Sequence, residues 1–194
     1  MSRMLLLTHG TNGDVLPIIS VGVALSADGH EVTVLTHAPY RRTVEDAGME
    51  FIPIDTADEY EQELEETARF AEGIFREPGS VLELYDRQRY FDQIRAELRT
   101  IEQWHTPGDT AVIARHTSGV SALMAGELLG VPTAWVSTWP AQLHALPLME
   151  YIYRYAAGAR LNQVRKEFGL AEVRDWRSWF DSAGMQIALW PEWF

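Results

Sequence analysis

Apolar and polar positions alternate between two periods in the first third of the chain. Short apolar runs at residues 3–8, 31–36 and 49–54 are typical of buried strands. Between them, residues 15–27 and 40–47 have the length and spacing of helices, and each ends close to a glycine. Strand and helix in strict alternation with short connections predict a parallel sheet covered by helices.

The middle of the chain departs from this alternation. Residues 58–105 predict two polar helices, separated by a turn at 77–79. The second helix, 81–104, carries an apolar stripe at helical spacing, which we expect to pack into the core rather than hold a cofactor: Leu84, Phe91, Ile94, Leu98 and Ile101. We expect the acidic run 58–66 to be a solvated helix face rather than a metal site.

The alternation resumes after residue 107. Strands are predicted at 110–114, 132–138 and 185–190, and helices at 119–129 and 149–168. No repeat or low-complexity linker interrupts the chain. The sequence therefore predicts one domain, residues 1–194, with a doubly wound, Rossmann-like α/β fold: a parallel sheet with its first strand central and helices on both faces.

Composition narrows the function classes. With 194 residues and 46% hydrophobic content the chain can bury one core, and its net charge of -12 excludes general binding of nucleic acid. Without cysteine there is no disulfide and no thiolate metal site. The sequence shows no signal peptide and no run of about 20 apolar residues, so we expect a cytoplasmic protein without stable membrane insertion.

The most informative segment is THGTNGDVLP, residues 8–17, where the first strand meets the first helix. Open α/β sheets bind ligands at this edge, where glycines let the backbone approach a ligand and the helix start offers free N–H groups. Gly10 and Gly13 do not form G-x-G-x-x-G, and no acidic residue ends the second strand at His37. A dinucleotide-binding oxidoreductase is therefore a remote alternative.

Asp14, in this segment, has two readings from its position alone. An aspartate at a helix start caps the helix, which stabilises it by about 1 kcal/mol. A carboxylate at the mouth of a cleft can also act as a general base toward a ligand hydroxyl. Spacing alone favours the cap, and the two roles do not exclude each other.

Three motifs together resemble one known family. They are the G-x-x-G-D-V-x-P core of residues 10–17, GHEV at 29–32 and AG-x-x-F-x-P-I at 47–54, and ELLGVPTAWVS at 127–137 extends the likeness. The chain resembles the N-terminal half of the bacterial GT-B glycosyltransferases that act on polyketides, peptides and sterols. The likeness fades between residues 58 and 105, where members of that family differ with their acceptors.

The resemblance implies an acceptor-binding domain. Its reaction moves a sugar, with inversion, from a nucleotide-sugar to a hydroxyl of a mostly apolar small molecule, without a cofactor or metal. The nucleotide-sugar is held mainly by a C-terminal domain, in cis or in trans, for which these 194 residues show no sequence, so the isolated chain is predicted to be inactive. The alternative is a free-standing or auxiliary acceptor-binding protein without transfer activity.

The resemblance also implies roles for the residues of the loop. Many relatives carry a catalytic histidine there, and matching G-D-V-L-P to their G-H-V-N-P places Asp14 at that position. This favours Asp14 as the general base. The neighbouring residues are expected to place the acceptor or the donor: His9, Gly10, Thr11, Asn12 and Gly13.

The fourth strand departs from the family pattern. Relatives often have an aspartate after it that orients the base, whereas this chain has Ala114, Arg115 and His116. Arg115 is able to pair with Asp14, which would weaken a base. His116 is either a second candidate base or a structural residue at the strand end.

Aromatic residues are more numerous than a plain α/β core requires. Most of these rings are expected to pack in the core or between helices. Trp139 follows the fifth strand at its carboxyl end, and we expect it, with Thr138 and Phe91, to line an acceptor pocket.

Overall fold

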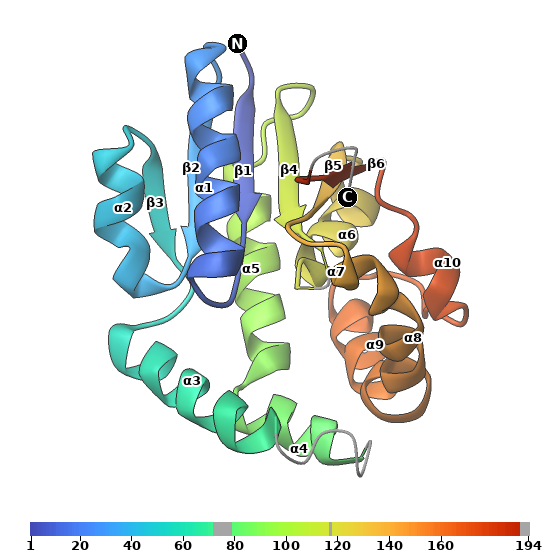
Figure 1. Cartoon of the computed structure of the whole chain (residues 1–194). Coiled ribbons are helices and arrows are strands. Elements are labelled where there is room, and N and C mark those ends of the chain that lie inside the picture. The colour runs from blue at the N-terminus through green and yellow to red at the C-terminus, as the bar shows by residue number, and fades with distance from the viewer. Residues whose placement is uncertain (72–78, 117, 191–194) are drawn as a thin grey trace.

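The computed structural model describes residues 1–71, 79–116 and 118–190. Its centre is one six-stranded sheet of order β3-β2-β1-β4-β5-β6, in which every neighbouring pair is parallel (Figure 1). The predicted parallel sheet with a central first strand is confirmed. The strands are β1 Arg3–Leu7, β2 Glu31–Thr36, β3 Glu50–Pro53, β4 Thr110–Arg115, β5 Thr133–Ser137 and β6 Met185–Ala188.

Helices connect the strands and cover both faces of the sheet, as the Rossmann-like prediction requires. In chain order they are α1 Asn12–Ala27, the 3-10 turn η1 Ala38–Tyr40, α2 Arg41–Asp46, α3 Ala57–Ala71, α4 Gly79–Arg87, α5 Tyr90–Trp104, α6 Val120–Leu129, α7 Ala141–His144, α8 Leu146–Ile152, the π-helical turn η2 Tyr153–Ala157, α9 Gly158–Glu167 and α10 Trp176–Phe180.

The strands alternate between two cores because successive side chains point to opposite faces. Leu6 and Val34 pack with α1 and α2 on one face, whereas Leu5, Leu7 and Trp135 pack with the larger helical layer on the other. The apolar stripe predicted on the second polar helix enters this larger core, with Ile94, Leu98 and Ile101 at most 2% exposed.

Residues 81–104 do not form the single helix that was predicted. The chain breaks at Arg89, whose φ of 52° is left-handed, and α5 begins at Tyr90. The break brings Tyr90 onto Tyr85, with ring centroids 4.3 Å apart. In a continuous helix residues five apart point in different directions, so this stacking requires the break. Of the predicted turn at 77–79, residues 77 and 78 lie outside the described part of the chain.

The predicted helix 149–168 is present as α8 and α9, but a π-helical turn joins them. Gly158 begins α9 directly against the Trp176 ring, and a Cβ at this position would collide with the Tyr153 carbonyl oxygen. The absence of a side chain therefore allows α10 to close this side of the larger core.

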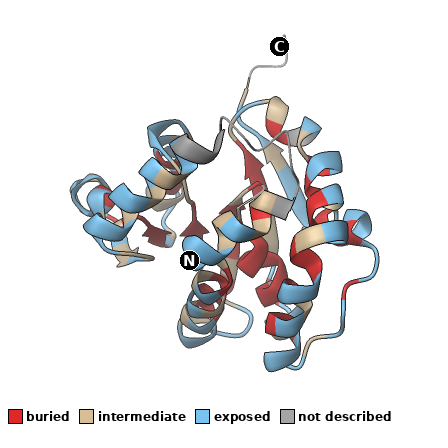
Figure 2. Ribbon diagram, turned by 90° about the horizontal axis from the view of Figure 1, so that it is seen from below, coloured by how far each residue is buried: buried red, intermediate tan, exposed pale blue. Residues whose placement is uncertain are grey.

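The carboxyl edge of the sheet faces α3 and α4, which lie beyond the strand ends in Figure 1. Figure 2, seen from below, shows buried segments of sheet and helix enclosed by helices with exposed outer faces. The strand ends are level, since Leu7 pairs with both Leu35 and Ala114. Residues that follow β1, β2 and β4 therefore meet at this edge. Within the described residues, no helix has the length and apolar content needed to cross a membrane.

Candidate functional site

The glycine loop, residues 9–14, leaves β1 at the carboxyl edge and starts α1. Thr11 is the N-cap of α1, and its backbone N–H donates to Asp14 Oδ2 at 3.2 Å. Asp14 is thus the third helical residue of a capping box rather than the N-cap itself. The capping role of Asp14 uses only Oδ2, one of its two carboxylate oxygen atoms.

The other oxygen of Asp14 meets the end of β4. Arg115 Nη2 lies 2.9 Å from Asp14 Oδ1, and the two side chains are 15% and 20% exposed. The pairing anticipated from the sequence is therefore present. A carboxylate has about four lone-pair positions, so these two contacts leave room for a ligand hydroxyl.

Gly10 brings the backbone against Asp14. Its φ is +108°, in the region that favours glycine, and an added Cβ would collide with Asp14 Oδ2. The conformation of Gly10 and the place of the Asp14 carboxylate are therefore coupled.

His37, the residue after β2, holds Gly10 from the far side. The Gly10 N–H donates to His37 Nε2 at 2.8 Å, and His37 Nδ1 lies 2.6 Å from Asp55 Oδ2. Because Nε2 accepts, the ring proton belongs on Nδ1, which donates to Asp55. Asp55 Oδ1 also accepts the Ala38 N–H at 2.9 Å, and His37 is fully buried.

Two tyrosines complete the contacts of the loop. Tyr60 on α3 donates its hydroxyl to the Gly10 carbonyl at 3.0 Å, and its ring lies 4.3 Å from that of His37. Tyr40 donates to Asn12 Oδ1 at 2.9 Å. Asn12, predicted to contact a ligand, thus has an intramolecular partner. Thr11 and Gly13 are exposed at the loop surface.

His9 points into the larger core, where a buried carboxylate meets it. His9 Nε2 lies 2.6 Å from Glu97 Oε1, and Ser121 donates to Glu97 Oε2, also at 2.6 Å. Burial by itself lowers the pKa of the His9 imidazole. The charge and the hydrogen bond of Glu97 raise this pKa by more than burial lowers it, so the net shift is upward. Glu97 is 3% exposed, and such buried charged pairs cluster at functional sites.

His116 follows β4 and has no such partner. It is fully buried with its ring edge-on to Trp135, 4.8 Å between centroids, and neither ring nitrogen has a hydrogen-bond partner. Burial, with the nearby positive charge of Arg115, lowers the pKa of His116 to about 4. The ring is therefore neutral and out of reach of a ligand, which fits the structural reading of this residue.

The residues predicted to line an acceptor pocket are not brought together. Trp139 is 55% exposed beyond β5, and the Thr138 N–H donates to Gln142 Oε1 at 2.7 Å. Phe91 is 4% exposed and packs edge-on against Tyr90, so it lies in the core, and its role in an acceptor pocket stays a prediction.

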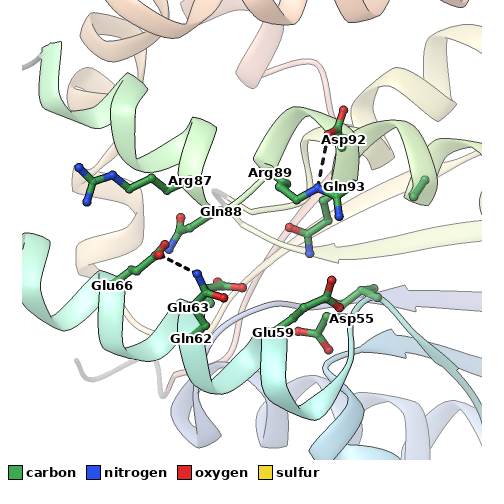
Figure 3. A pocket seen from close by; sticks show the side chains of 12 residues that line it. Asp55, Glu59, Gln62, Glu63, Glu66, Arg87, Gln88, Arg89, Asp92 and Gln93 are labelled. Atoms are coloured by element: carbon green, nitrogen blue, oxygen red, sulfur yellow. Dashed lines mark hydrogen bonds and ion pairs between the residues drawn. The ribbon is translucent and has the colours of Figure 1, made fainter.

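A cavity of about 330 Å³ lies beside the loop, between α3 and the start of α5. Figure 3 shows Asp55, Glu59 and Glu63 on one wall, with Arg87 and Arg89 across from the helix α3. Burial raises the pKa of the Glu63 carboxyl, so part of the acidic run 58–66 is not a solvated face. The lining is polar: Ile54, Asp55, Glu59, Gln62, Glu63, Glu66, Arg87, Gln88, Arg89, Asp92, Gln93 and Ala96.

Three side chains at the edge of this cavity bring possible metal-ligand atoms close together. His37, Asp55 and Glu63 each offer an atom, and these atoms lie within 4.8 Å of one another. Both ring nitrogens of His37 are already hydrogen-bonded, however, so a metal ion would have to displace one of these contacts.

Sequence reasoning missed His37, Asp55, Tyr60 and Glu97. The signal for two of them was present, because His37 and Asp55 are among the first polar residues after the second and third strands. Glu97 interrupts the apolar stripe between Ile94 and Ile101, and a charged residue on a buried helix face requires a partner.

Comparisons with known proteins identify the family and the fold of the chain. Residues 4–131 match the glycosyltransferase family 28 N-terminal domain. A sterol 3-beta-glucosyltransferase of Sclerotinia sclerotiorum is 40% identical over 53 residues, 27% of this chain and 4% of its own length. One of Glomerella lagenarium is 24% identical over 182 residues, 89% of this chain and 12% of its own.

Solved structures show the same fold. The Streptomyces sp. SF2575 glycosyltransferase SsfS6, complexed with thymidine diphosphate, superposes with a TM-score of 0.61 at 22% identity. The match covers 99% of this chain and 50% of that protein. The chain thus spans half of this solved relative and a small part of the sterol enzymes. Since the family model matches most of its residues, the chain belongs to glycosyltransferase family 28, through that family's N-terminal domain.

Proposed function

We propose that residues 1–194 are the acceptor-binding domain of a glycosyltransferase that transfers a sugar from a nucleotide-sugar to an acceptor hydroxyl. The donor is held mainly by a second domain, supplied in cis or in trans. Family membership supports glycosyl transfer, and the structure complexed with thymidine diphosphate supports a nucleotide-linked donor. Within the described part of the chain, the glycine loop is the segment best placed at the carboxyl edge to receive an acceptor.

The observation that carries the proposal is the setting of Asp14. Its carboxylate is fixed by the Thr11 N–H and by Arg115, yet remains 20% exposed at the central strand's end. In the proposed step Asp14 takes the proton of the acceptor hydroxyl, whose oxygen attacks the anomeric carbon of the sugar. The bond from that carbon to the diphosphate breaks from the opposite side, which inverts the configuration.

The cavity between α3 and α5 refines the proposed acceptor. Its wall begins at Asp55, which touches His37, so an acceptor that occupies it would lie next to the glycine loop. Because most of its lining residues carry an amide, carboxyl or guanidinium group beside an apolar side-chain stem, we propose that the acceptor carries polar groups at this end. The apolar part of the acceptor would then lie elsewhere, with exposed Trp139 one candidate contact.

The test is a transfer assay in which the second domain is restored or supplied. Hydroxylated compounds are screened with uridine and thymidine diphosphate sugars, and products are detected by mass spectrometry. The proposal expects glycosylated product that depends on this chain. In a parallel titration, the chain alone should bind the nucleotide-sugars weakly or not at all. Micromolar binding without a second domain, or acceptor binding with no transfer, would favour a different role for this domain.

A further inference from the structure

The contacts of Gly10 suggest how the glycine loop is held in its conformation. His37 accepts the Gly10 N–H through Nε2 at 2.8 Å, and this is possible only while Nε2 carries a lone pair. In this arrangement Nε2 accepts, and the ring proton of His37 lies on Nδ1. Which tautomer a histidine adopts is set by the partner of its other nitrogen.

Asp55 is that partner. Its Oδ2 lies 2.6 Å from His37 Nδ1, and its Oδ1 is fixed by the Ala38 N–H at 2.9 Å. A carboxylate only accepts hydrogen bonds, so it draws the ring proton to Nδ1. His37 is fully buried and Asp55 is 11% exposed, so water does not compete freely for either contact.

The tautomer of His37 affects the position of Asp14 through Gly10. Gly10 is held on three sides: its N–H by His37, its carbonyl by Tyr60, and its Cα face by the Asp14 carboxylate, which leaves no room for a Cβ. If the His37 proton moved to Nε2, two donors would face each other and Gly10 would shift. The Asp14 carboxylate would shift with it.

We infer that Asp55 and His37 are positioning residues, which fix the glycine loop by locking one tautomer of His37 and so place Asp14 for proton transfer. This inference rests on the proposed function for its effect on turnover. Its effect on the tautomer and on Gly10 does not depend on that function.

The decisive variant is Asp55→Asn. An asparagine that donates its amide to Nδ1 favours the Nε2–H tautomer, which opposes the Gly10 N–H. Two-dimensional ¹⁵N–¹H spectra of the histidine rings and the Gly10 amide report both events. We expect the Nδ1–H tautomer in the wild type, and the Nε2–H tautomer with a displaced Gly10 amide signal in the variant. Asp58→Asn removes the same charge from the exposed first turn of α3 and should change neither signal.

Turnover of the assembled enzyme supplies the second readout. A misplacement of about 1 Å costs up to about 100-fold, so we expect Asp55→Asn to lower kcat by about 10- to 100-fold. Adding His37→Gln, whose amide oxygen can accept the Gly10 N–H, should recover part of that loss. A role in stability alone would not give this recovery, because the double variant removes more native contacts than the single one.

Two results would overturn the inference: an Nε2–H or doubly protonated His37 in the wild type, or an unchanged Gly10 amide and kcat in Asp55→Asn. If the ring signals behave as expected but no acceptor is glycosylated by the wild type, the proposed function fails while the tautomer lock stands.

Discussion

At the carboxyl ends of β1 and β2, His9 and His37 each have a carboxylate partner at 2.6 Å. Buried polar atoms without a hydrogen-bond partner are nevertheless present at both ends. Among the described residues they are His9 Nδ1 and Thr36 Oγ1 at the ends of β1 and β2, and they are more numerous at the ends of β4 and β5, on Arg115, His116, Thr138 and Gln142. We call the first region, with the glycine loop, Asp55 and Glu97, the loop half, and these four residues the β4–β5 half.

The loop half and the β4–β5 half, both at the carboxyl edge of the sheet, therefore differ in how completely their buried polar groups are paired within the protein. The loop half is organised before any ligand arrives, which is what proton transfer to a fixed carboxylate requires. The β4–β5 half is incomplete, and only Arg115 reaches across to Asp14. We therefore expect large functional effects from changes in the loop half and mild effects from changes in the β4–β5 half.

The largest expected effect is that of Asp14→Asn on turnover. The amide oxygen can accept from the Thr11 N–H but not from Arg115 as well, so we expect some fall in melting temperature without unfolding, and the amide cannot take a proton. Loss of a general base lowers kcat by about 100- to 10,000-fold. The matched control is Asp28→Asn, which removes the same charge from the exposed far end of α1 and should leave kcat unchanged. Near-normal turnover of Asp14→Asn would move the base to another group.

Gly10→Ala tests the geometry of the loop half. Alanine is strained at a φ of +108° and its Cβ would collide with the Asp14 carboxylate, so we expect about 1–3 kcal/mol lower free energy of unfolding. Gly13→Ala is the control, because a Cβ there meets no atom within 4 Å and lies inside α1. Urea unfolding of both variants measures the difference, and equal stabilities would contradict the described loop.

The His9–Glu97 pair predicts a pH dependence. Since the pKa of folded His9 is raised above its ordinary 6.5, its contribution to stability is complete below about pH 6.5 and is lost as pH rises through the raised value. Glu97→Gln should remove this contribution, with a destabilisation of about 1–3 kcal/mol that shrinks as pH rises. Glu102→Gln, exposed on the same helix, is the control. A destabilisation independent of pH from 5 to 9 would show that the pair is not charged.

His116 predicts the opposite slope with a smaller effect. Its pKa is lowered to about 4, so the folded state loses stability as pH falls from about 6.5 toward that value. His116→Phe removes the ionisation and two unpartnered nitrogens, and we expect a change in stability within about 1 kcal/mol at pH 7 and a shallower loss in acid. Turnover should persist. Its abolition without unfolding would instead make His116 the base.

The sequence predicted the frame of the molecule better than its site. Short apolar runs placed all six strands, because burial of the central strands on both faces leaves a strong local signal. The break at Arg89 and the π-helical turn at 153–157 were missed, since packing of Tyr85 on Tyr90 and of Gly158 on Trp176 fixes them, and no local pattern records it.

In the site too, local sequence predicted some features, whereas contacts between distant residues were missed. The loop and the pairing of Asp14 with Arg115 were visible, because both lie at ends of predicted strands. The partners His37–Asp55 and His9–Glu97 join residues 18 and 88 positions apart, and only the fold brings them together. Phe91 lies in the core, as its place on the apolar stripe predicted, and is not among the residues that line the described cavity.

The central claim is that Asp14 accepts a proton from the acceptor, and the ionisation of the acceptor itself tests it most directly. Among compounds that the assembled enzyme glycosylates, kcat of the wild type and of Asp14→Asn is compared for an aliphatic alcohol and for a phenol already ionised at the assay pH. The account predicts a loss of about 100- to 10,000-fold for the alcohol and nearly none for the ionised phenol, which has no proton to give. An equal loss with both acceptors would contradict it, because Asp14 would then act on structure or binding rather than as a base.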